Sequence, residues 1–189
     1  LARGAYKASF TLSTVPTRKK NKVLKEMAKT LLKHKESIIK ANQKDLRAAK
    51  TSGISSALLD RLTLSEIRIR EMASAINDVG KLKDPIGHIL REWKRPNGLK
   101  LQKVSVPLGV VLVIYEARPN VTAECVSLCL KSGNSIILKG GSEAYHSNMI
   151  LSKLFQEVLR KAKLPQEAVS FVATREHQAV DVLVGLDKY

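Results

Sequence analysis

The spacing of apolar residues changes from a helical to a strand period near residue 88 of this 189-residue chain. Before that point, apolar side chains recur every three or four positions, which predicts amphipathic helices. Ser65 is a favourable N-cap, and Gly80 is expected to stop the helix that Ser65 begins. The predicted helices span about residues 2–12, 17–51 and 65–80, with a short helical turn around Leu58–Leu62.

Beyond that point the pattern has a period of two, which is typical of a half-buried strand. Apolar and polar side chains alternate from Ile89 to Trp93, and the alternation resumes at Leu99 after a turn signal at 96–98. These positions predict a β-hairpin. A bulge is expected near Gln102, where the alternation slips.

From residue 107 onwards, strand patterns alternate with helical ones. The run from Gly109 to Tyr115 is almost entirely apolar and β-branched, which predicts a strand covered on both faces. The helix that follows is expected to end at Lys131, before Gly133. Further strands are predicted at 135–138 and 168–172, and the last helix at 174–184.

The predicted fold class is α/β, with N-terminal helices and a β-hairpin leading into the first half of a doubly wound, Rossmann-like parallel sheet. Two domains are predicted: residues 1–106, which are helical with the hairpin, and residues 107–189, which form half of a nucleotide-binding domain. Three strands make a poor closed unit. We therefore expect the chain to be a portion of a larger domain, whose later strands complete the sheet.

The net charge of +16 is concentrated in residues 1–100, which contain 23 Lys and Arg against 9 Asp and Glu. Such a surplus fits either a face that contacts nucleic acid or a solvated helix surface. Acids are interspersed among the lysines, and aromatic residues make up only 4% of the chain, so the second interpretation is favoured. No apolar run reaches the roughly 18 residues that a membrane span requires.

Cys125 and Cys129 are the only cysteines, and they fall one helical turn apart on an apolar face. No further Cys or nearby His completes a tetrahedral set of ligands, so no metal site is predicted. We expect two reduced thiols packed in the core, which is typical of a reducing compartment.

Candidate chemistry lies at Lys139-Gly-Gly-Ser142, between a predicted strand and a predicted helix. Ser142 is placed to cap that helix, whose free backbone N–H groups and dipole favour an anion. The two glycines allow close approach of the backbone. The segment predicts a phosphate site for a nucleotide, bound by Lys139, Gly140, Gly141 and Ser142.

Longer motifs surround this segment: Tyr115-Glu-Ala-Arg-Pro-Asn120 in the first strand–helix turn and Leu138-Lys-Gly-Gly-Ser-Glu-Ala144 in the second. Together with Ala41-Asn-Gln-Lys-Asp-Leu46, Asp60-Arg-Leu62 and Lys83-Asp-Pro-Ile-Gly87, they closely resemble the gamma-glutamyl phosphate reductase (glutamate-5-semialdehyde dehydrogenase) family. That family belongs to the aldehyde dehydrogenase superfamily. The resemblance covers essentially all 189 residues, which match the N-terminal portion of the family's sequence.

The resemblance implies an oxidoreductase of proline biosynthesis that reduces gamma-glutamyl phosphate to glutamate-5-semialdehyde with NADPH. It implies a sheet of the aldehyde dehydrogenase type, a small-molecule substrate, and a cytoplasmic location, or a mitochondrial one within a bifunctional eukaryotic synthase. A homo-oligomer stays open. The family's catalytic Cys lies downstream of the matched segments, so no catalytic residue is assigned here. The alternative function is a basic helical and α/β binding protein that contacts nucleic acid.

By the same resemblance, Lys139 corresponds to the lysine that reaches the cofactor's adenosine ribose or phosphate. Arg118 is a candidate for binding the anionic end of the substrate, the alternative being a salt-bridged loop arginine. Asn120 is assigned to the substrate as well, or else is an ordinary residue at a helix start. Glu116 is expected to order its loop rather than to act as a base.

Overall fold

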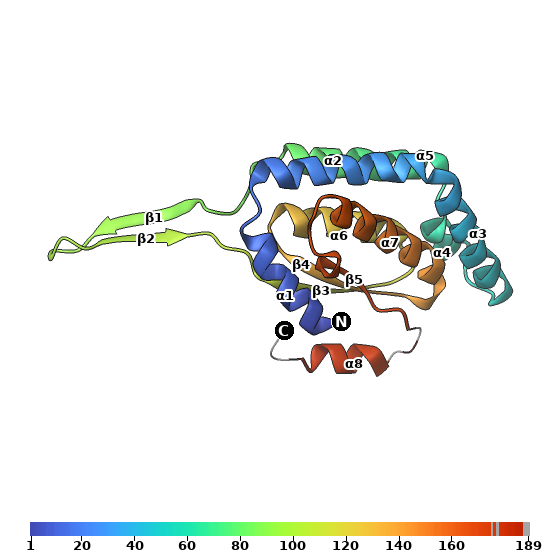
Figure 1. Ribbon diagram of the computed structural model, residues 1–189. Helices are drawn as coiled ribbons and strands as arrows, with labels where there is room; N and C mark the ends of the chain where they lie inside the picture. The colour runs from blue at the N-terminus through green and yellow to red at the C-terminus, as the bar shows by residue number, and fades with distance from the viewer. Residues whose placement is uncertain (175, 177, 187–189) are drawn as a thin grey trace.

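The computed structural model describes residues 1–174, 176 and 178–186 (Figure 1). The helical pattern before residue 88 is confirmed. Ser55 and Ser65 accept hydrogen bonds from the backbone N–H groups of Leu58 and Arg68, so their hydroxyls cap α4 and α5 as serine N-caps do. The helices of this region are α1 (Ala2–Ser13), α2 (Thr17–Lys33), α3 (Lys35–Thr51), α4 (Ser56–Leu62) and α5 (Glu66–Lys81).

The prediction of one long helix over 17–51 is wrong. Helices α2 and α3 meet at His34, whose φ of −104° and ψ of 18° interrupt the helical path. Residues 33–37 contain no apolar side chain, so nothing on this turn is anchored in the core and the chain changes direction there. The turn carries Ile38 back into the interior, where its side chain is fully buried.

The predicted stop at Gly80 is also wrong, because α5 continues to Lys81. A glycine inside a helix costs only about 1 kcal/mol relative to alanine, which packing offsets. The carbonyl of Gly80 accepts a hydrogen bond from Nζ of Lys131 at 2.9 Å.

The hairpin consists of β1 (Ile89–Lys94) and β2 (Lys100–Val104), paired antiparallel as predicted. It extends away from the body of the molecule in Figure 1. Its register shifts between Ile89 and Arg91, so the extra residue of the bulge is on β1, across from the position expected on β2.

The second half forms a parallel sheet with the strand order β3-β4-β5. This confirms the alternation of strands and helices. Helix α6 ends before Gly133, whose φ of +72° is the left-handed conformation that glycine adopts readily. The elements are β3 (Val110–Tyr115), α6 (Pro119–Lys131), β4 (Ser135–Gly140), α7 (Tyr145–Lys161), β5 (Val169–Phe171) and α8 (Gln178–Val184). The last helix was expected from residue 174; positions 175 and 177 lie outside the described residues.

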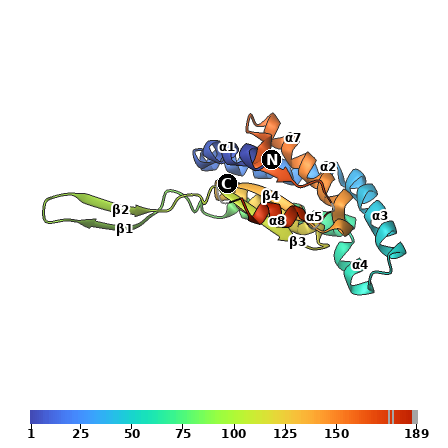
Figure 2. The ribbon, with the colours of Figure 1, turned by 90° about the horizontal axis from the view of Figure 1, so that it is seen from below.

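The helices form layers on both faces of the sheet. Helices α6 and α7 lie between the sheet and an outer pair, α2 and α5, whereas α8 lies on the opposite side (Figure 1). Seen from below, α8 crosses over β3 and β4 (Figure 2). One apolar cluster joins α2, α5, α6, α7 and β4, including Leu24, Met27, Ile76, Leu138 and Phe155. None of the described helices is long and apolar enough to cross a membrane.

Strand β4 is the only strand that lies in the middle of the described sheet, and all six of its residues are buried. Strand β3 was expected to be covered on both faces, and this is wrong for the described residues, because Ile114 is 48% exposed. β3 is an edge strand of this sheet, since it pairs with β4 alone.

Candidate functional site

Two cavities flank the loop that follows β3. The first, named here the lysine cavity, has a volume of about 590 Å³ and lies at the carboxyl ends of β3 and β4. Ligands of doubly wound sheets bind at such strand ends. The cavity is lined by Ile54, Leu58, Leu62, Ile114, Tyr115, Glu116, Ala117, Lys139, Gly140, Gly141, Ser142, Glu143 and Val180.

Lys139 is the charged residue most deeply buried in the lysine cavity. It is the fifth residue of β4 and is only 5% exposed. Its Nζ donates a hydrogen bond to the carbonyl oxygen of Gly140 at 3.2 Å and forms no ion pair with any residue that the structure describes. A buried cation with one neutral partner is costly, so an anionic ligand in this cavity would compensate its charge.

The two glycines permit close packing of the strand ends. A side-chain carbon on Gly140 would overlap Nδ2 of Asn148 and lie 3.2 Å from Cζ of Tyr115. A side-chain carbon on Gly141 would lie 2.6 Å from Oε2 of Glu143 and 3.4 Å from the carbonyl carbon of Glu116. The loops after β3 and β4 therefore touch at Gly141, and both glycines line the lysine cavity.

Ser142 lines the same cavity but does not cap a helix, which corrects the sequence prediction. It begins a short 3-10 helix, and its hydroxyl donates to Oε1 of Glu143 at 3.2 Å. The first turn of α7 is occupied instead by the carboxylate of Asp45, which accepts from the backbone N–H groups of His146 and Ser147 at 3.0 and 2.7 Å. The helix dipole of α7 thus stabilises a protein carboxylate, and the N–H groups of His146 and Ser147 are already bonded to Asp45.

Asp45 belongs to a buried polar network that sequence reasoning missed. Asn42, one turn earlier on α3, donates to the carbonyl of Leu62 and to Oγ of Ser147, and accepts from the backbone N–H of Leu64. Both side chains are at most 2% exposed. The network holds α3 and the α4–α5 connection against the start of α7. Polar residues at three-residue spacing on the buried face of a predicted helix were the signal that could have revealed it.

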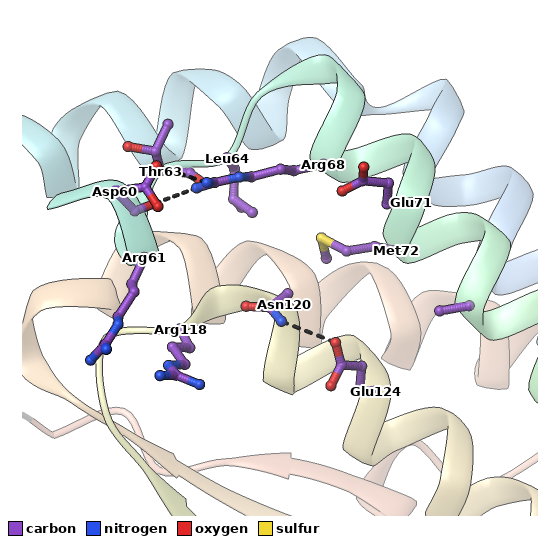
Figure 3. Close-up of a pocket in the computed structure, with 11 residues that line it drawn as sticks. Asp60, Arg61, Thr63, Leu64, Arg68, Glu71, Met72, Arg118, Asn120 and Glu124 are labelled. Carbon is purple, nitrogen blue, oxygen red and sulfur yellow. Dashed lines mark hydrogen bonds and ion pairs between the residues drawn. The ribbon is translucent and has the colours of Figure 1, made fainter. Parts of the chain in front are cut away.

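The second cavity, named here the arginine cavity, has a volume of about 490 Å³ (Figure 3). It lies between α4, α5 and the start of α6. It is lined by Asp60, Arg61, Thr63, Leu64, Arg68, Glu71, Met72, Ala75, Arg118, Asn120 and Glu124.

Both predicted substrate residues, Arg118 and Asn120, line the arginine cavity rather than the lysine cavity. Arg118 is the residue before α6 and is exposed, and its guanidinium forms no ion pair within the described residues. The alternative of a salt-bridged loop arginine therefore does not hold there. Asn120 is in the first turn of α6, and its Nδ2 donates to Oε1 of Glu124 at 3.0 Å.

The loop 116–118 lies between the two cavities. The hydrogen bonds of Tyr115, the residue that precedes the loop, anchor it to the helices. The Tyr115 hydroxyl lies 2.6 Å from Oγ1 of Thr122, which in turn donates to Oδ1 of Asn148 at 3.0 Å. Burial raises the pKa of the Tyr115 phenol despite the bond to Thr122. Tyr115 is therefore neutral. Its hydrogen bond to Thr122 connects β3 to α6, and the bond from Thr122 to Asn148 continues the connection to α7.

The two thiols are not part of either cavity. Burial raises the pKa of Cys129 to about 12, and burial together with the charge of Glu124 raises that of Cys125. Such thiols are poor nucleophiles. Within the part of the chain that the structure describes, no three His, Cys, Asp or Glu side chains gather as metal ligands would.

The chain as a whole has counterparts among known proteins. The profile described as "Aldehyde dehydrogenase family" matches residues 1–188. The chain belongs to the aldehyde dehydrogenase family. Members of this family use nicotinamide cofactors, and the family is one of oxidoreductases.

Within the family, the chain is similar to gamma-glutamyl phosphate reductases. It is 49% identical to that of Persephonella marina and 47% identical to that of Halothermothrix orenii, in both cases over 100% of this chain. These matches span 42% and 45% of the respective relatives, so the chain covers less than half of their length.

Solved structures show the same similarity. The crystal structure of gamma-glutamyl phosphate reductase from Thermotoga maritima superimposes with a TM-score of 0.97 at 38% identity, over 100% of this chain and 45% of that one. A salicylaldehyde dehydrogenase from Pseudomonas putida G7 superimposes with a TM-score of 0.75 at 16% identity, over 99% of this chain and 36% of that one, which shows the shared fold.

Proposed function

We propose that this chain provides the cofactor cavity and part of the substrate site of an enzyme that reduces gamma-glutamyl phosphate to glutamate-5-semialdehyde with NADPH. Such an enzyme would serve proline biosynthesis in the cytoplasm. The similarity to gamma-glutamyl phosphate reductases over the whole chain supports the reaction.

The observation that carries the proposal is the buried Lys139 of the lysine cavity, which forms no ion pair among the described residues. The residues present fit a phosphorylated dinucleotide: a cation without a counter-ion among the described residues, and two glycines in the lining of the cavity. NADPH, when bound, would supply a hydride. Lys139 would hold its 2′-phosphate, the backbone of Gly140 and Gly141 would allow close approach, and Ser142 would offer a hydroxyl at the rim.

Arg118 and Asn120 would hold the substrate on the other side of the loop 116–118. A guanidinium with no ion pair in the described structure suits a carboxylate or phosphate, which it binds through two parallel hydrogen bonds. Cofactor and substrate would thus approach each other across one loop, and the protein would orient them.

The test joins residues 1–189 to the downstream part of the Persephonella marina relative, to make what is named here the hybrid enzyme. Oxidation of NADPH at 340 nm is followed with freshly prepared gamma-glutamyl phosphate. We expect NADPH-dependent turnover that disappears when gamma-glutamyl phosphate is replaced by glutamate. A hybrid enzyme that is folded by circular dichroism but inactive would contradict the proposal.

A second candidate, binding of a polyanion such as nucleic acid, has one observation in its favour. A groove of about 620 Å³ between α2 and α7 contains six lysines. Its glutamates, Glu26 and Glu157, are paired with Lys29 and Lys161, which leaves four lysines without an ion pair among the described residues: Lys19, Lys22, Lys33 and Lys163. Retention on heparin that falls steeply with salt, and that is lost on changing these four lysines to glutamine, would support this candidate.

A homo-oligomer is also part of our proposal. The hairpin presents apolar side chains to solvent, with Ile89, Leu90 and Leu99 each more than half exposed. Exposed apolar patches of this kind mark contacts between proteins. Sedimentation velocity of the hybrid enzyme would test it, with a monomer as the contrary result.

A further inference from the structure

The arginine cavity contains charges of both signs that form no ion pair within the described part of the chain. Arg68 already has partners within the protein, because its Nη2 lies 2.8 Å from Oδ1 of Asp60 and its Nη1 donates a hydrogen bond to the carbonyl of Thr63. The charges of Arg68 and Asp60 neutralise each other, and their ion pair holds α4 against the start of α5. The remaining charged side chains of the lining are Arg61, Arg118, Glu71 and Glu124.

None of these four side chains has an ion-pair partner within the described residues. Arg61 is in the last turn of α4, and Glu71 is in the middle of α5; both are exposed, and neither side chain makes a hydrogen bond with a described residue. Glu124 accepts one hydrogen bond, from the uncharged amide of Asn120. Four charges around one cavity are therefore left for a ligand.

The charges are separated by sign across the cavity. Figure 3 shows Arg61 and Arg118 on one side and Glu71 and Glu124 on the other, with Met72 and Asn120 between them. A cavity for an anion alone would not carry two carboxylates on its wall, because they would repel it. A ligand with a separated positive and negative group matches this arrangement.

We propose that the arginine cavity binds the zwitterionic head of an α-amino-acid substrate. Glu71 and Glu124 bind its α-ammonium group, and Arg61 and Arg118 bind its α-carboxylate. The proposal rests on the proposed function, which it deepens: it names the residues that select gamma-glutamyl phosphate from acyl phosphates lacking either charged group.

The carboxylates bind the ammonium group as charge-assisted acceptors, and the guanidinium groups can bind the carboxylate through paired N–H donors. Asn120 positions Glu124 through its hydrogen bond. Asn120 therefore has this role in addition to its own contact with the ligand. Met72 supplies an apolar surface between the two charged sides, suited to the methylene groups of a glutamyl chain.

The test uses three stable amides that differ only in the head. L-glutamine carries both charges, 4-carbamoylbutanoate lacks the ammonium group, and 4-aminobutanamide lacks the carboxylate. Their binding to the 189-residue chain is measured by isothermal titration calorimetry. We expect L-glutamine to bind roughly tenfold or more tightly than either truncated amide, because each loses one charge-assisted contact. Equal binding of the three amides, or no binding of L-glutamine, would overturn the proposal.

Single substitutions test which side of the cavity binds the ammonium group and which side binds the carboxylate. Glu71→Gln is expected to weaken L-glutamine roughly tenfold and to leave 4-carbamoylbutanoate unchanged, whereas Arg61→Gln is expected to weaken both and to leave 4-aminobutanamide unchanged. Arg70→Gln and Asp78→Asn, which change exposed residues of α5 outside the cavity, are the matched controls. A variant that weakens all three amides equally, or none, would contradict the assignment.

The hybrid enzyme separates this inference from the proposed function. Reduction of gamma-glutamyl phosphate with a much higher kcat/KM than of glutaryl phosphate or 4-aminobutyryl phosphate supports both. Equal reduction of the three would overturn the inference and leave the proposed function standing. Selective binding of L-glutamine without any reduction would leave the inference standing and contradict the proposed function.

Discussion

Asp45 and Ser147 are 102 residues apart in the sequence, and the carboxylate of Asp45 accepts hydrogen bonds from both the backbone N–H and the hydroxyl of Ser147, at 2.7 and 2.6 Å. The pair joins α3 to the start of α7. Asn42, which also donates to Oγ of Ser147, connects the pair to the carbonyl of Leu62 at the end of α4. Asp45 is 2% exposed, so its carboxylate oxygens are bonded to the protein rather than to bulk water.

We predict that Asp45→Asn lowers the free energy of unfolding by about 2–3 kcal/mol, because a buried carboxylate that accepts three hydrogen bonds is replaced by a neutral amide. Urea unfolding at pH 7 measures the loss. Ser147→Ala removes one of the three bonds and should cost less, about 1 kcal/mol. An equal loss in the two variants would show that the carboxylate is not the centre of the network.

We predict that Gly140→Ala lowers the free energy of unfolding by about 1–3 kcal/mol, the usual cost of overpacking a core. The added methyl group would overlap the amide of Asn148, which is fully buried. Asn148→Ala alone loses the bond from Thr122, but combined with Gly140→Ala it should recover part of the loss. Thermal unfolding of the two single variants and the double variant gives their coupling. Strict additivity would contradict the steric explanation.

We predict that Lys139→Met weakens NADPH at least tenfold and NADH much less, because one charge-assisted contact is lost from the 2′-phosphate. Fluorescence titration of the hybrid enzyme with each nucleotide provides the comparison. Lys153→Met, an exposed lysine of α7, is the control. Equal weakening of the two nucleotides would place Lys139 on the ribose that they share.

We predict that Cys129 of the folded chain is nearly inert to thiol reagents at pH 8. A pKa of about 12 in place of 9 leaves about a thousandfold less thiolate, and the side chain is also buried. Reaction with Ellman's reagent, before and after unfolding in guanidinium, would show this. Cys125→Ser assigns the signal to Cys129, and rapid reaction of that folded variant would contradict the prediction.

We predict that the buried pair of Lys20 and Asp84 makes stability fall in acid. Burial acts to raise the pKa of the Asp84 carboxyl, but hydrogen bonds from Thr17, Lys20 and the backbone N–H of Ile86 outweigh it, so that pKa is lowered. A lowered pKa means that the folded state favours the carboxylate. The stabilisation is therefore present above the unfolded-state pKa of about 4 and is lost as the pH falls through the lower folded-state value.

At pH 7, Asp84→Asn should cost about 3–5 kcal/mol, because Lys20 is 2% exposed and would keep a buried charge without its partner. The difference between wild type and variant should shrink below pH 4. Urea unfolding from pH 3 to pH 7 measures it, and Asp78→Asn, at an exposed pair with Lys81, is the control. A difference that is constant with pH would contradict the assignment to Asp84.

The sequence by itself determined the order of helices and strands, because these depend on local periodicity and on residues such as Ser65 and Gly133 that act within one turn. It also singled out the segment 139–142, which lines the lysine cavity in the structure. The break at His34 was not predicted, because the apolar stripe resumes at Ile38 after the polar residues 33–37, and a polar turn of this length also occurs on the surface of an unbroken helix.

Tertiary structure alone decided which cavity each predicted site residue lines. The sequence assigned Lys139 to the cofactor and Arg118 to the substrate, and the fold places them in different cavities, because the loop 116–118 and the backbone of Gly141 meet between them. The anion at the start of α7 likewise comes from Asp45, which lies about a hundred residues earlier in the chain. A helix start attracts a negative charge wherever the charge originates, and only the folded chain decides which carboxylate arrives.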